Sequence, residues 1–170
     1  MKTLIAYYSR TGKNESIAVE LQKKLEARLK AEHEPKDVPP SVQMERIDDA
    51  KSRSGPLGFI TGGMDATLRR QTKIHTMGKK PEDYDMVLVV SPLWSGVLPP
   101  AIRTYLSQNR EKMKKIAFLS VSGSGEGNKK ALPDFESTAG RPAEASLLLS
   151  KKQFEAGYSE RLEEFVGKLK

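Results

Sequence analysis

The feature that most constrains the fold is an uninterrupted apolar run from Met86 to Val90, the longest in the chain. Strands with one face in water alternate apolar and polar residues, whereas strands covered on both faces carry continuous apolar runs. A similar run, Thr3 to Tyr8, lies near the start of the chain. Both runs therefore predict interior strands of a parallel sheet. A membrane span needs about 20 apolar residues, so we expect none here.

Further segments complete an alternating pattern of strands and helices. Strands are predicted at 3–8, 42–47, 85–91, 115–121 and 143–150, and amphipathic helices at 17–29, 100–106 and 154–169, with Pro35, Pro39 and Pro40 after the first helix. Such alternation predicts an α/β fold with a parallel sheet between two helical layers. The length of 170 residues, without repeat or linker, predicts one domain over 1–170.

The composition of the chain excludes some kinds of chemistry and some classes of binding partner. The chain has no cysteine, which excludes disulfides, thiolate metal sites and dithiol redox chemistry, so redox chemistry would need a bound cofactor. The net charge is +7, but the basic pairs are scattered and no aromatic residues are interleaved with them, so we expect no nucleic-acid binding. The first apolar run is too short for a signal peptide, which predicts a cytoplasmic protein.

Three loops of unusual composition follow the first, third and fourth predicted strands. Ligands of open α/β sheets bind outside the carboxyl ends of the strands, at the point where the strand order reverses. The loops are Ser9-Arg10-Thr11-Gly12-Lys13-Asn14, then Ser91-Pro92-Leu93-Trp94-Ser95-Gly96, then Ser122-Gly123-Ser124-Gly125-Glu126-Gly127-Asn128. Their coincidence at one edge of the sheet predicts a binding site.

The first loop has the composition of a phosphate cradle, because hydroxyls, a glycine and backbone N–H groups meet at a helix start. A nucleoside-triphosphate loop would require glycine at Tyr7 and a hydroxyl residue at Asn14, and the chain has neither. The loop therefore suits a phosphomonoester bound without metal. The alternative is an ordinary turn and helix cap.

The other two loops suit a planar ring. Trp94, the single tryptophan, follows the most apolar strand and stands near Gly96, so it is placed to stack on a ring that the backbone approaches closely. The alternative is a tryptophan that only caps the core. The glycines and serines of the third loop suit close wrapping of a ligand by backbone, or else a flexible surface loop.

Two segments carry a family resemblance. SRTGKN resembles the flavodoxin phosphate loop, [ST]-x-T-G-x-T, and YDMVLVVSPLWSGVLPPAIRTYL resembles the third strand, flavin loop and following helix of flavodoxins. The resemblance covers most of the chain in order and spacing. It implies a flavodoxin-like three-layer α/β/α sandwich, a five-stranded parallel sheet in the order 2-1-3-4-5, and one noncovalent FMN.

The resemblance also implies roles for individual residues. Ser9, Thr11, Gly12 and Asn14 would bind the phosphate, and Arg10 and Lys13 would either steer it or be solvated. Trp94, preceded by Pro92 and Leu93, would lie against the isoalloxazine, and the backbone of Ser95 and Gly96 would face N5. Ser122, Gly123, Ser124, Gly125 and Glu126 would line the pyrimidine end. No catalytic side chain and no metal ligand are predicted.

Three departures from the family pattern bear on function. Asn14 replaces the usual last threonine, the third loop has no aromatic residue, and the chain is basic where electron-transfer flavodoxins are strongly acidic. Reduced FMN is an anion, so basic surroundings predict a less negative potential for the last reduction step. The missing aromatic residue predicts an open flavin face.

The sequence leaves three functions open. The protein is an electron carrier that docks with redox partner proteins, an NAD(P)H-dependent FMN quinone reductase, or a cofactor-free interaction module. Segment 50–81 is predicted to be a crossover with a helix at 64–70, and the alternative is a lid or substrate wall. His33 and His75 lie in loop or helix-end contexts without the spacing of metal ligands, so neither is predicted to be catalytic, while Arg103 and Arg110 are predicted on the surface.

Overall fold

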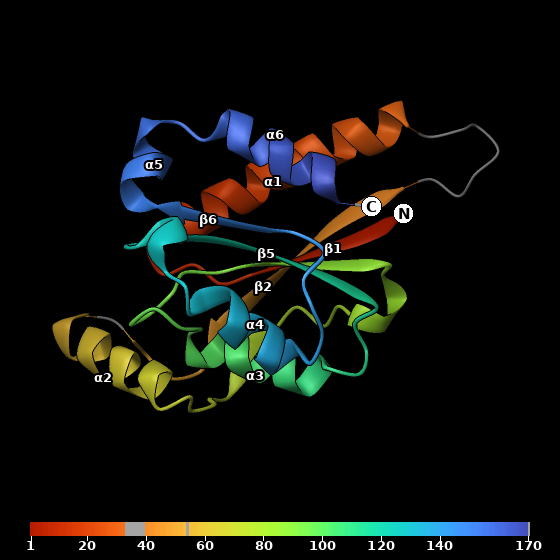
Figure 1. Cartoon of the computed structure of the whole chain (residues 1–170). Helices are drawn as coiled ribbons and strands as arrows, with labels where there is room; N and C mark the ends of the chain where they lie inside the picture. The colour runs from red at the N-terminus through yellow and green to blue at the C-terminus, as the bar shows by residue number, and fades with distance from the viewer. Residues whose placement is uncertain (33–39, 54, 170) are drawn as a thin grey trace.

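The computed structural model describes residues 1–32, 40–53 and 55–169. A six-stranded sheet in the order β3-β2-β1-β4-β5-β6 lies between two helical layers (Figure 1). The strands are β1 Lys2–Tyr7, β2 Ser41–Asp49, β3 Ile74–Thr76, β4 Met86–Val90, β5 Lys115–Ser122 and β6 Ser146–Ser150. The helices are α1 Lys13–Ala31, α2 Gly55–Thr67, α3 Pro100–Asn109, α4 Ala131–Ala139, α5 Lys151–Ala156 and α6 Ser159–Lys168, with single 3₁₀ turns η1 Pro81–Asp83 and η2 Gly125–Gly127.

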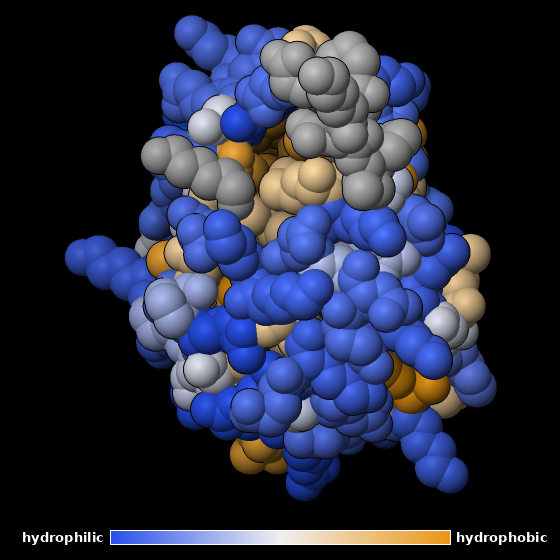
Figure 2. All heavy atoms as spheres, turned by 90° about the vertical axis from the view of Figure 1, so that its right-hand side faces the viewer, coloured by the Kyte–Doolittle hydropathy of each residue, from blue (hydrophilic) through white to orange (hydrophobic). Residues whose placement is uncertain are grey.

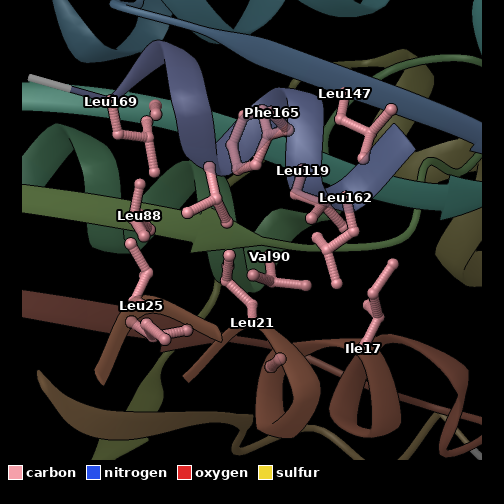
Figure 3. Packing of buried hydrophobic residues seen from close by; sticks show 14 of the residues in the cluster. Ile17, Leu21, Leu25, Leu88, Val90, Leu119, Leu147, Leu162, Phe165 and Leu169 are labelled. Carbon is pink, nitrogen blue, oxygen red and sulfur yellow. The ribbon is translucent and has the colours of Figure 1, made fainter. Parts of the chain in front are cut away.

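The central strands are apolar throughout because each of their faces is buried in a different core. In β4, Leu88 and Val90 pack with α1 and α6, whereas Val87 and Val89 pack with α3 and α4. Figure 3 shows the first of these cores, where side chains of α1, such as Leu21 and Leu25, and of α6, such as Phe165, meet those of the central strands. Because successive side chains of a strand point to opposite faces of the sheet, each central strand contributes residues to both cores.

The strand prediction is confirmed for the parallel part of the sheet, but the predicted number of strands, five, is wrong, because the sheet has six. The order 2-1-3-4-5 corresponds to β2-β1-β4-β5-β6, and each of these neighbours pairs in parallel. The sixth strand, β3, pairs antiparallel with β2 through Ile47, Asp48 and Asp49. Three residues are too few to show a periodicity, so only the exposed edge of β2 defines this strand. The strand predicted at 143–150 begins later, at Ser146.

Several helices also differ from the prediction. The helix predicted at 64–70 is α2, which begins at Gly55 and ends at Thr67. The final helix, predicted as continuous, is divided into α5 and α6 at Gly157, whose φ of 111° lies outside the helical region. Helix α4 was not predicted, although it buries Ala131, Phe135 and Ala139 at helical spacing. The predicted positions His33, Pro35 and Pro39 lie outside the described residues.

The sequence predicts no membrane-spanning segment, and the helices can be compared with this prediction. Within residues 1–32, 40–53 and 55–169, no helix is both long enough and apolar enough to cross a membrane.

Helix α4 gives a direct test of the second core. The ring of Phe135 is fully buried and stacks on Phe118 with centroids 4.5 Å apart. We expect Phe135→Ala to lower the free energy of unfolding by about 3–5 kcal/mol, because it leaves a cavity against β5. The exposed Ser137 of the same helix supplies the control, since Ser137→Ala should change it by less than about 0.5 kcal/mol. Equal urea midpoints for the two variants would contradict the packing.

Candidate functional site

The three predicted loops meet at the carboxyl ends of β1, β4 and β5, where the strand order reverses. A pocket of about 370 Å³ lies between them. It is lined by Arg10, Thr11, Lys13, Asn14, Pro92, Leu93, Trp94, Val121, Ser122, Gly123 and Lys151. Larger hollows lie elsewhere: one of about 530 Å³ along β6 and α6, one of about 580 Å³ near the amino end of β1, and an open groove of about 430 Å³ on α2. The smaller pocket is the candidate because it lies at the switch point of the sheet.

The other predicted residues lie around this pocket rather than in its lining. Ser9 and Gly12 belong to the first loop, and Ser95 and Gly96 form the turn after Trp94. Ser124, Gly125 and Glu126 lie in or beside η2. There Glu126 accepts a hydrogen bond of 2.6 Å from Arg161, and Gly125 lies against the Ser150 backbone. Sequence analysis missed Val121 and Lys151, which come from β5 and α5.

Gly12 sets the geometry of the first loop. It is the N-cap of α1 and has a left-handed backbone, with φ 84° and ψ −20°. Glycine adopts this conformation without steric cost, and it has no side chain with which to cap the first-turn N–H groups of the helix. Those N–H groups, with the positive end of the helix dipole, are suited to an anion at the pocket.

Asn14 ties the first loop to β5. Its side chain is buried, its Nδ2 donates to the Val121 carbonyl at 3.0 Å, and its Oδ1 accepts from the Val121 N–H at 3.0 Å. Both ends of the amide are therefore engaged with one backbone residue. We expect Asn14 to hold the first and third loops together, rather than to replace the hydroxyl contact of the family pattern.

Two hydroxyls beside the pocket are buried without a partner. Within the part of the chain that the structure describes, neither Ser9 Oγ nor Ser122 Oγ has a hydrogen-bond partner. Buried hydroxyls in folded proteins are almost always paired, so each unpaired one requires an explanation. They lie at the ends of β1 and β5, on loops that flank the pocket. A polar ligand held between these loops would satisfy both.

The residues after Trp94 form a two-residue hairpin turn. Trp94 and Val97 exchange two backbone hydrogen bonds, of 2.9 and 3.1 Å, and the residues between them, Ser95 and Gly96, have φ values of 51° and 83°. Positive φ at both central positions is the type I′ geometry. Asn128 Nδ2 donates to the Gly96 carbonyl at 2.6 Å, so the third loop fixes the second.

Trp94 is held from behind. Its ring meets Tyr8 edge-on, with centroids 5.7 Å apart, and the Arg53 guanidinium lies 5.9 Å from its centroid. A methyl group at Gly62 would come within 2.8 Å of the ring, so glycine lets α2 pack against it. The ring also lines the pocket, which leaves it accessible to a ligand from that side.

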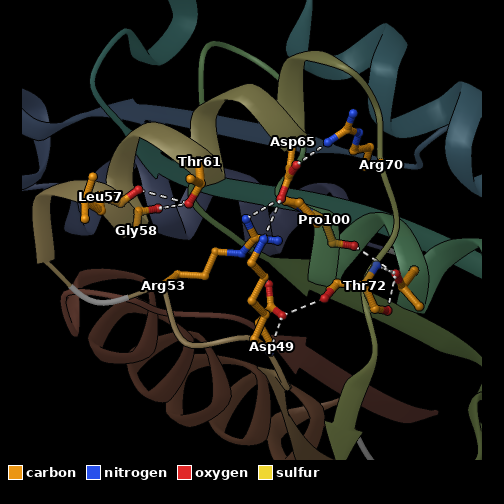
Figure 4. Close-up of polar contacts among 11 residues, drawn as sticks. Asp49, Arg53, Leu57, Gly58, Thr61, Asp65, Arg70, Thr72 and Pro100 are labelled. Atoms are coloured by element: carbon orange, nitrogen blue, oxygen red, sulfur yellow. Dashed lines mark hydrogen bonds and ion pairs between the residues drawn. The ribbon is translucent and has the colours of Figure 1, made fainter.

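A buried ion-pair network supports this arrangement (Figure 4). Arg53 donates to Asp49 at 2.8 Å and to Asp65 at 2.7 Å, and so joins the end of β2 to α2. Thr72 donates to Asp49 at 2.7 Å, and Arg70 donates to Asp65 at 3.2 Å. Sequence analysis missed the network, because its members lie in a segment of mixed composition without clear periodicity and none matches a motif.

The network and the burial around it shift two pKa values. The hydrogen bond from Arg53 lowers the pKa of Asp65 below its ordinary value of 3.8, and Arg70 adds to this effect. Burial raises the pKa of Tyr8 to about 12, with a smaller contribution from the Asp49 carboxylate. Both groups therefore keep a fixed charge state near neutral pH, which favours a constant electrostatic environment behind Trp94.

The prediction that Arg103 lies on the surface is wrong. Its side chain is buried, and its Nη2 donates to Asp134 at 2.7 Å. Asp134 also accepts the N–H of Leu98 at 2.9 Å, so α3 and α4 together fix the chain that leaves the Trp94 turn. Arg110 is exposed, as predicted.

Among the described residues, no group of three or more histidine, cysteine or acidic side chains could hold a metal ion. His75 is exposed on β3, on the far side of β2 from β1 and the pocket.

The family is shown by comparison with protein-family models. A protein-family model described as flavodoxin matches residues 2–154. The chain belongs to the flavodoxin family. A search of curated proteins found no match to this flavodoxin-family chain.

Solved structures share the fold at low sequence identity. A flavoprotein from Lactobacillus acidophilus NCFM, in complex with FMN, is 20% identical, with a TM-score of 0.66 over 89% of this chain and 93% of that one. Two-electron reduced flavodoxin from Megasphaera elsdenii is 15% identical, with a TM-score of 0.56 over 98% and 99%. The flavodoxin of Streptococcus pneumonia TIGR4 is 16% identical, with a TM-score of 0.55 over 99% and 97%.

The Asp65 ion pairs predict a specific pH dependence of stability. Because the folded-state pKa of Asp65 is lowered, its contribution is complete above the unfolded pKa near 3.8 and disappears as the pH falls through the lower folded value. We expect Asp65→Asn to lower the free energy of unfolding by about 1.5–3 kcal/mol at pH 7. The loss relative to wild type should shrink as the pH falls below 4, measured by urea unfolding across pH.

The exposed Asp83 provides the matched control for this measurement. Asp83→Asn should leave the pH dependence of the wild type in place. A constant difference between Asp65→Asn and wild type at every pH would show that the ion pairs do not depend on the Asp65 charge.

Proposed function

We propose that this flavodoxin-family protein binds one FMN noncovalently in the pocket between its three loops and transfers electrons through it. The observation that carries the proposal is the pair of unpartnered buried hydroxyls, Ser9 and Ser122, at the pocket that Trp94 lines. Family membership supports it, and so does the FMN complex of the Lactobacillus acidophilus neighbour. When bound, FMN would supply a ring system that stores one or two electrons.

The first loop would hold the phosphate. The hydroxyls of Ser9 and Thr11 and the N–H groups that follow Gly12 provide donors at the start of α1. Arg10, Lys13 and Lys151 bring positive charge to the pocket. Glu155 partly offsets it, since it lies 2.9 Å from the Lys13 ammonium and 3.9 Å from that of Lys151.

The other two loops would hold the ring. Trp94 would stack on the isoalloxazine, with Pro92 and Leu93 beside it. The turn at Ser95 and Gly96 would present its backbone to N5, in a geometry that Asn128 fixes. Ser122 and Gly123 would line the pyrimidine end. Ser124, Gly125 and Glu126, which lie in or beside η2, would support this loop from outside the pocket.

One observation favours a second candidate, the NAD(P)H-dependent quinone reductase. Of the described residues that line the pocket, Trp94 is the one aromatic residue, so the ring would be stacked on one face alone. A free face gives a nicotinamide or a quinone access for hydride transfer. Rapid NADPH oxidation with a quinone acceptor would support the reductase, and reduction only by a partner protein would support the carrier.

We further propose that residues 1–170 act as one domain in the cytoplasm. The core on the α1 side draws on residues from Ile5 in β1 to Leu169 after α6, which supports one folding unit. The lack of cysteine is compatible with a reducing compartment.

FMN binding is tested first by mixing the purified protein with FMN, desalting it and recording the visible spectrum. Near one equivalent of flavin should remain, and the fluorescence of Trp94, the single tryptophan, should be quenched. A colourless protein that fails to take up added FMN would contradict the proposal and favour the cofactor-free interaction module.

The unpaired hydroxyls predict opposite effects on stability and binding. We expect Ser9→Ala and Ser122→Ala to raise the stability of the FMN-free protein by about 1 kcal/mol, because each removes an unsatisfied buried group. The same changes should weaken FMN about tenfold or more, because each removes a contact to the ligand. Thermal unfolding and fluorescence titration measure the two effects.

Ser120 is the matched control, because its hydroxyl is also buried and unpaired among the described residues but lies within β5 rather than on a loop that flanks the pocket. Ser120→Ala should raise stability without changing FMN affinity. Equal affinities for all three alanine variants and the wild type would refute the proposed role of Ser9 and Ser122.

The basic pocket predicts the redox potential. We expect the potential of the last reduction step to be less negative than in acidic flavodoxins, and Lys151→Glu to lower it by tens of millivolts at low salt. About 59 mV corresponds to a tenfold change in relative affinity for a one-electron step. The exposed Lys23 of α1 supplies the control, Lys23→Glu. A potentiometric titration that gives the same value for Lys151→Glu and wild type would contradict the electrostatic argument.

A further inference from the structure

Helix α2 directs its large apolar side chains outward. Leu57, Ile60, Met64 and Leu68, called here the α2 apolar face, are spaced three or four residues apart and are 78%, 58%, 57% and 56% exposed. An amphipathic surface helix normally directs such residues into the core. Among the described residues, the other exposed large apolar side chains are Val19 and Met77. The side of the molecule turned away from α2 is mostly hydrophilic (Figure 2).

Glycines fix this inverted orientation. Methyl groups at Gly58, Gly62 and Gly63 would lie 2.4 Å from the Arg53 carbonyl carbon, 2.8 Å from the Trp94 ring and 3.2 Å from the Ser95 hydroxyl. The inward side of α2 therefore excludes a side chain at Gly58 and Gly62 unless a neighbour moves, and it is tight at Gly63. The exposure of the apolar residues follows from the close packing of the helix on Trp94 and Arg53.

The α2 apolar face begins at the rim of the proposed FMN site. A shallow groove of about 430 Å³ is lined by Ile60, Gly63, Met64, Thr67, Leu68 and Ser95. Ser95 belongs to the turn that we place against the flavin, and Ser95 Oγ lies 3.5 Å from the Gly63 carbonyl. A protein seated in this groove would lie beside Trp94 and the turn.

Around the α2 apolar face, positively charged side chains are exposed and negatively charged ones are buried. The cations are exposed at the rim, where the side chains of Lys51, Arg69 and Arg70 are 57%, 66% and 62% accessible. Their acidic partners lie underneath, because Asp65 and Asp134 are 12% and 3% accessible. An approaching molecule would therefore meet an apolar centre with a positive rim.

We propose that the α2 apolar face is a docking surface for an acidic protein with an apolar contact patch, and that this protein exchanges electrons with the bound FMN. The proposal rests on the proposed function. Complementary charge steers association and selects partners, and apolar contacts at the centre of an interface supply most of its binding energy. The net charge of +7 over the whole chain acts in the same direction.

The charge distribution argues against two other occupants. A second copy of this chain would bring Lys51, Arg69 and Arg70 close to the same cations. Helices that lie in a lipid surface carry lysine and arginine on their polar side, whereas α2 reads GPLGFITGGMDAT and its one charged residue, Asp65, is turned inward.

Plant plastocyanin with zinc in place of copper is a suitable probe, because it is acidic, has an exposed apolar patch and is redox-inert. Binding is measured by calorimetry at low salt, with and without FMN. We expect binding that weakens as salt is added, and a loss of about tenfold or more in the double variant Ile60→Ser/Leu68→Ser and in Arg69→Glu. Met77→Ser and Lys23→Glu, which change an exposed apolar residue and an exposed lysine elsewhere, should bind like wild type. Basic cytochrome c should not bind.

The absence of plastocyanin binding, or equal affinities in the patch and control variants, would overturn the proposal. Light scattering that shows a dimer lost in Ile60→Ser/Leu68→Ser would assign the face to a second copy. Sedimentation with phosphatidylserine vesicles that is lost in the same variant would assign it to lipid. Either outcome also overturns the proposal. The visible spectrum of each protein reports FMN loading separately, so failure of the cofactor site is distinguished from failure of the docking surface.

Discussion

The structure depends on the burial of β1 and β4 on both faces. Each strand contributes alternate side chains to two cores, so Ile5 and Leu88 pack on the α1 side while Leu4 and Val87 pack on the α3 side. This double coverage requires parallel strands joined by crossover helices, because only such connections place helices on both faces. The carboxyl ends of the strands then come together at one edge, and the loops that follow them meet there whatever their sequence.

Side-chain amides and ion pairs convert that meeting of loops into a defined pocket. Asn14 links the first loop to Val121, Asn128 links the third loop to Gly96, and Asp134 links α4 to Leu98. Each contact joins segments distant in sequence. It also supplies a hydrogen bond to a backbone group that would otherwise have no partner. On the loops that flank the pocket, the hydroxyls of Ser9 and Ser122 have no partner among the described residues. Their position beside the pocket favours a ligand there over a merely structural loop cluster.

Helix α2 connects the pocket to the outer surface. Its glycines allow it to approach Trp94 and Ser95, and Arg53 anchors it to β2 through Asp49 and Asp65. The same close approach leaves its large apolar residues in solvent. The exposed apolar residues of α2 lie together beside the proposed cofactor site, where a partner protein would cover them. Segment 50–81 is therefore a crossover with a helix, and that helix forms the wall behind Trp94.

The sequence by itself determined the α/β class and the three loops at the candidate site, because hydrophobic periodicity and local turn residues report directly on burial and chain direction. The parallel strand order came from the resemblance of two segments to flavodoxins. The sequence did not determine β3, which exists only by pairing with the edge of β2, or α4, whose nine residues give a short pattern. It also missed the burial of Arg103, the Arg53 network and the two hydrogen bonds that join the Asn14 amide to Val121. Most of those contacts join residues twelve or more positions apart in the chain, and only the tertiary structure brings such residues together.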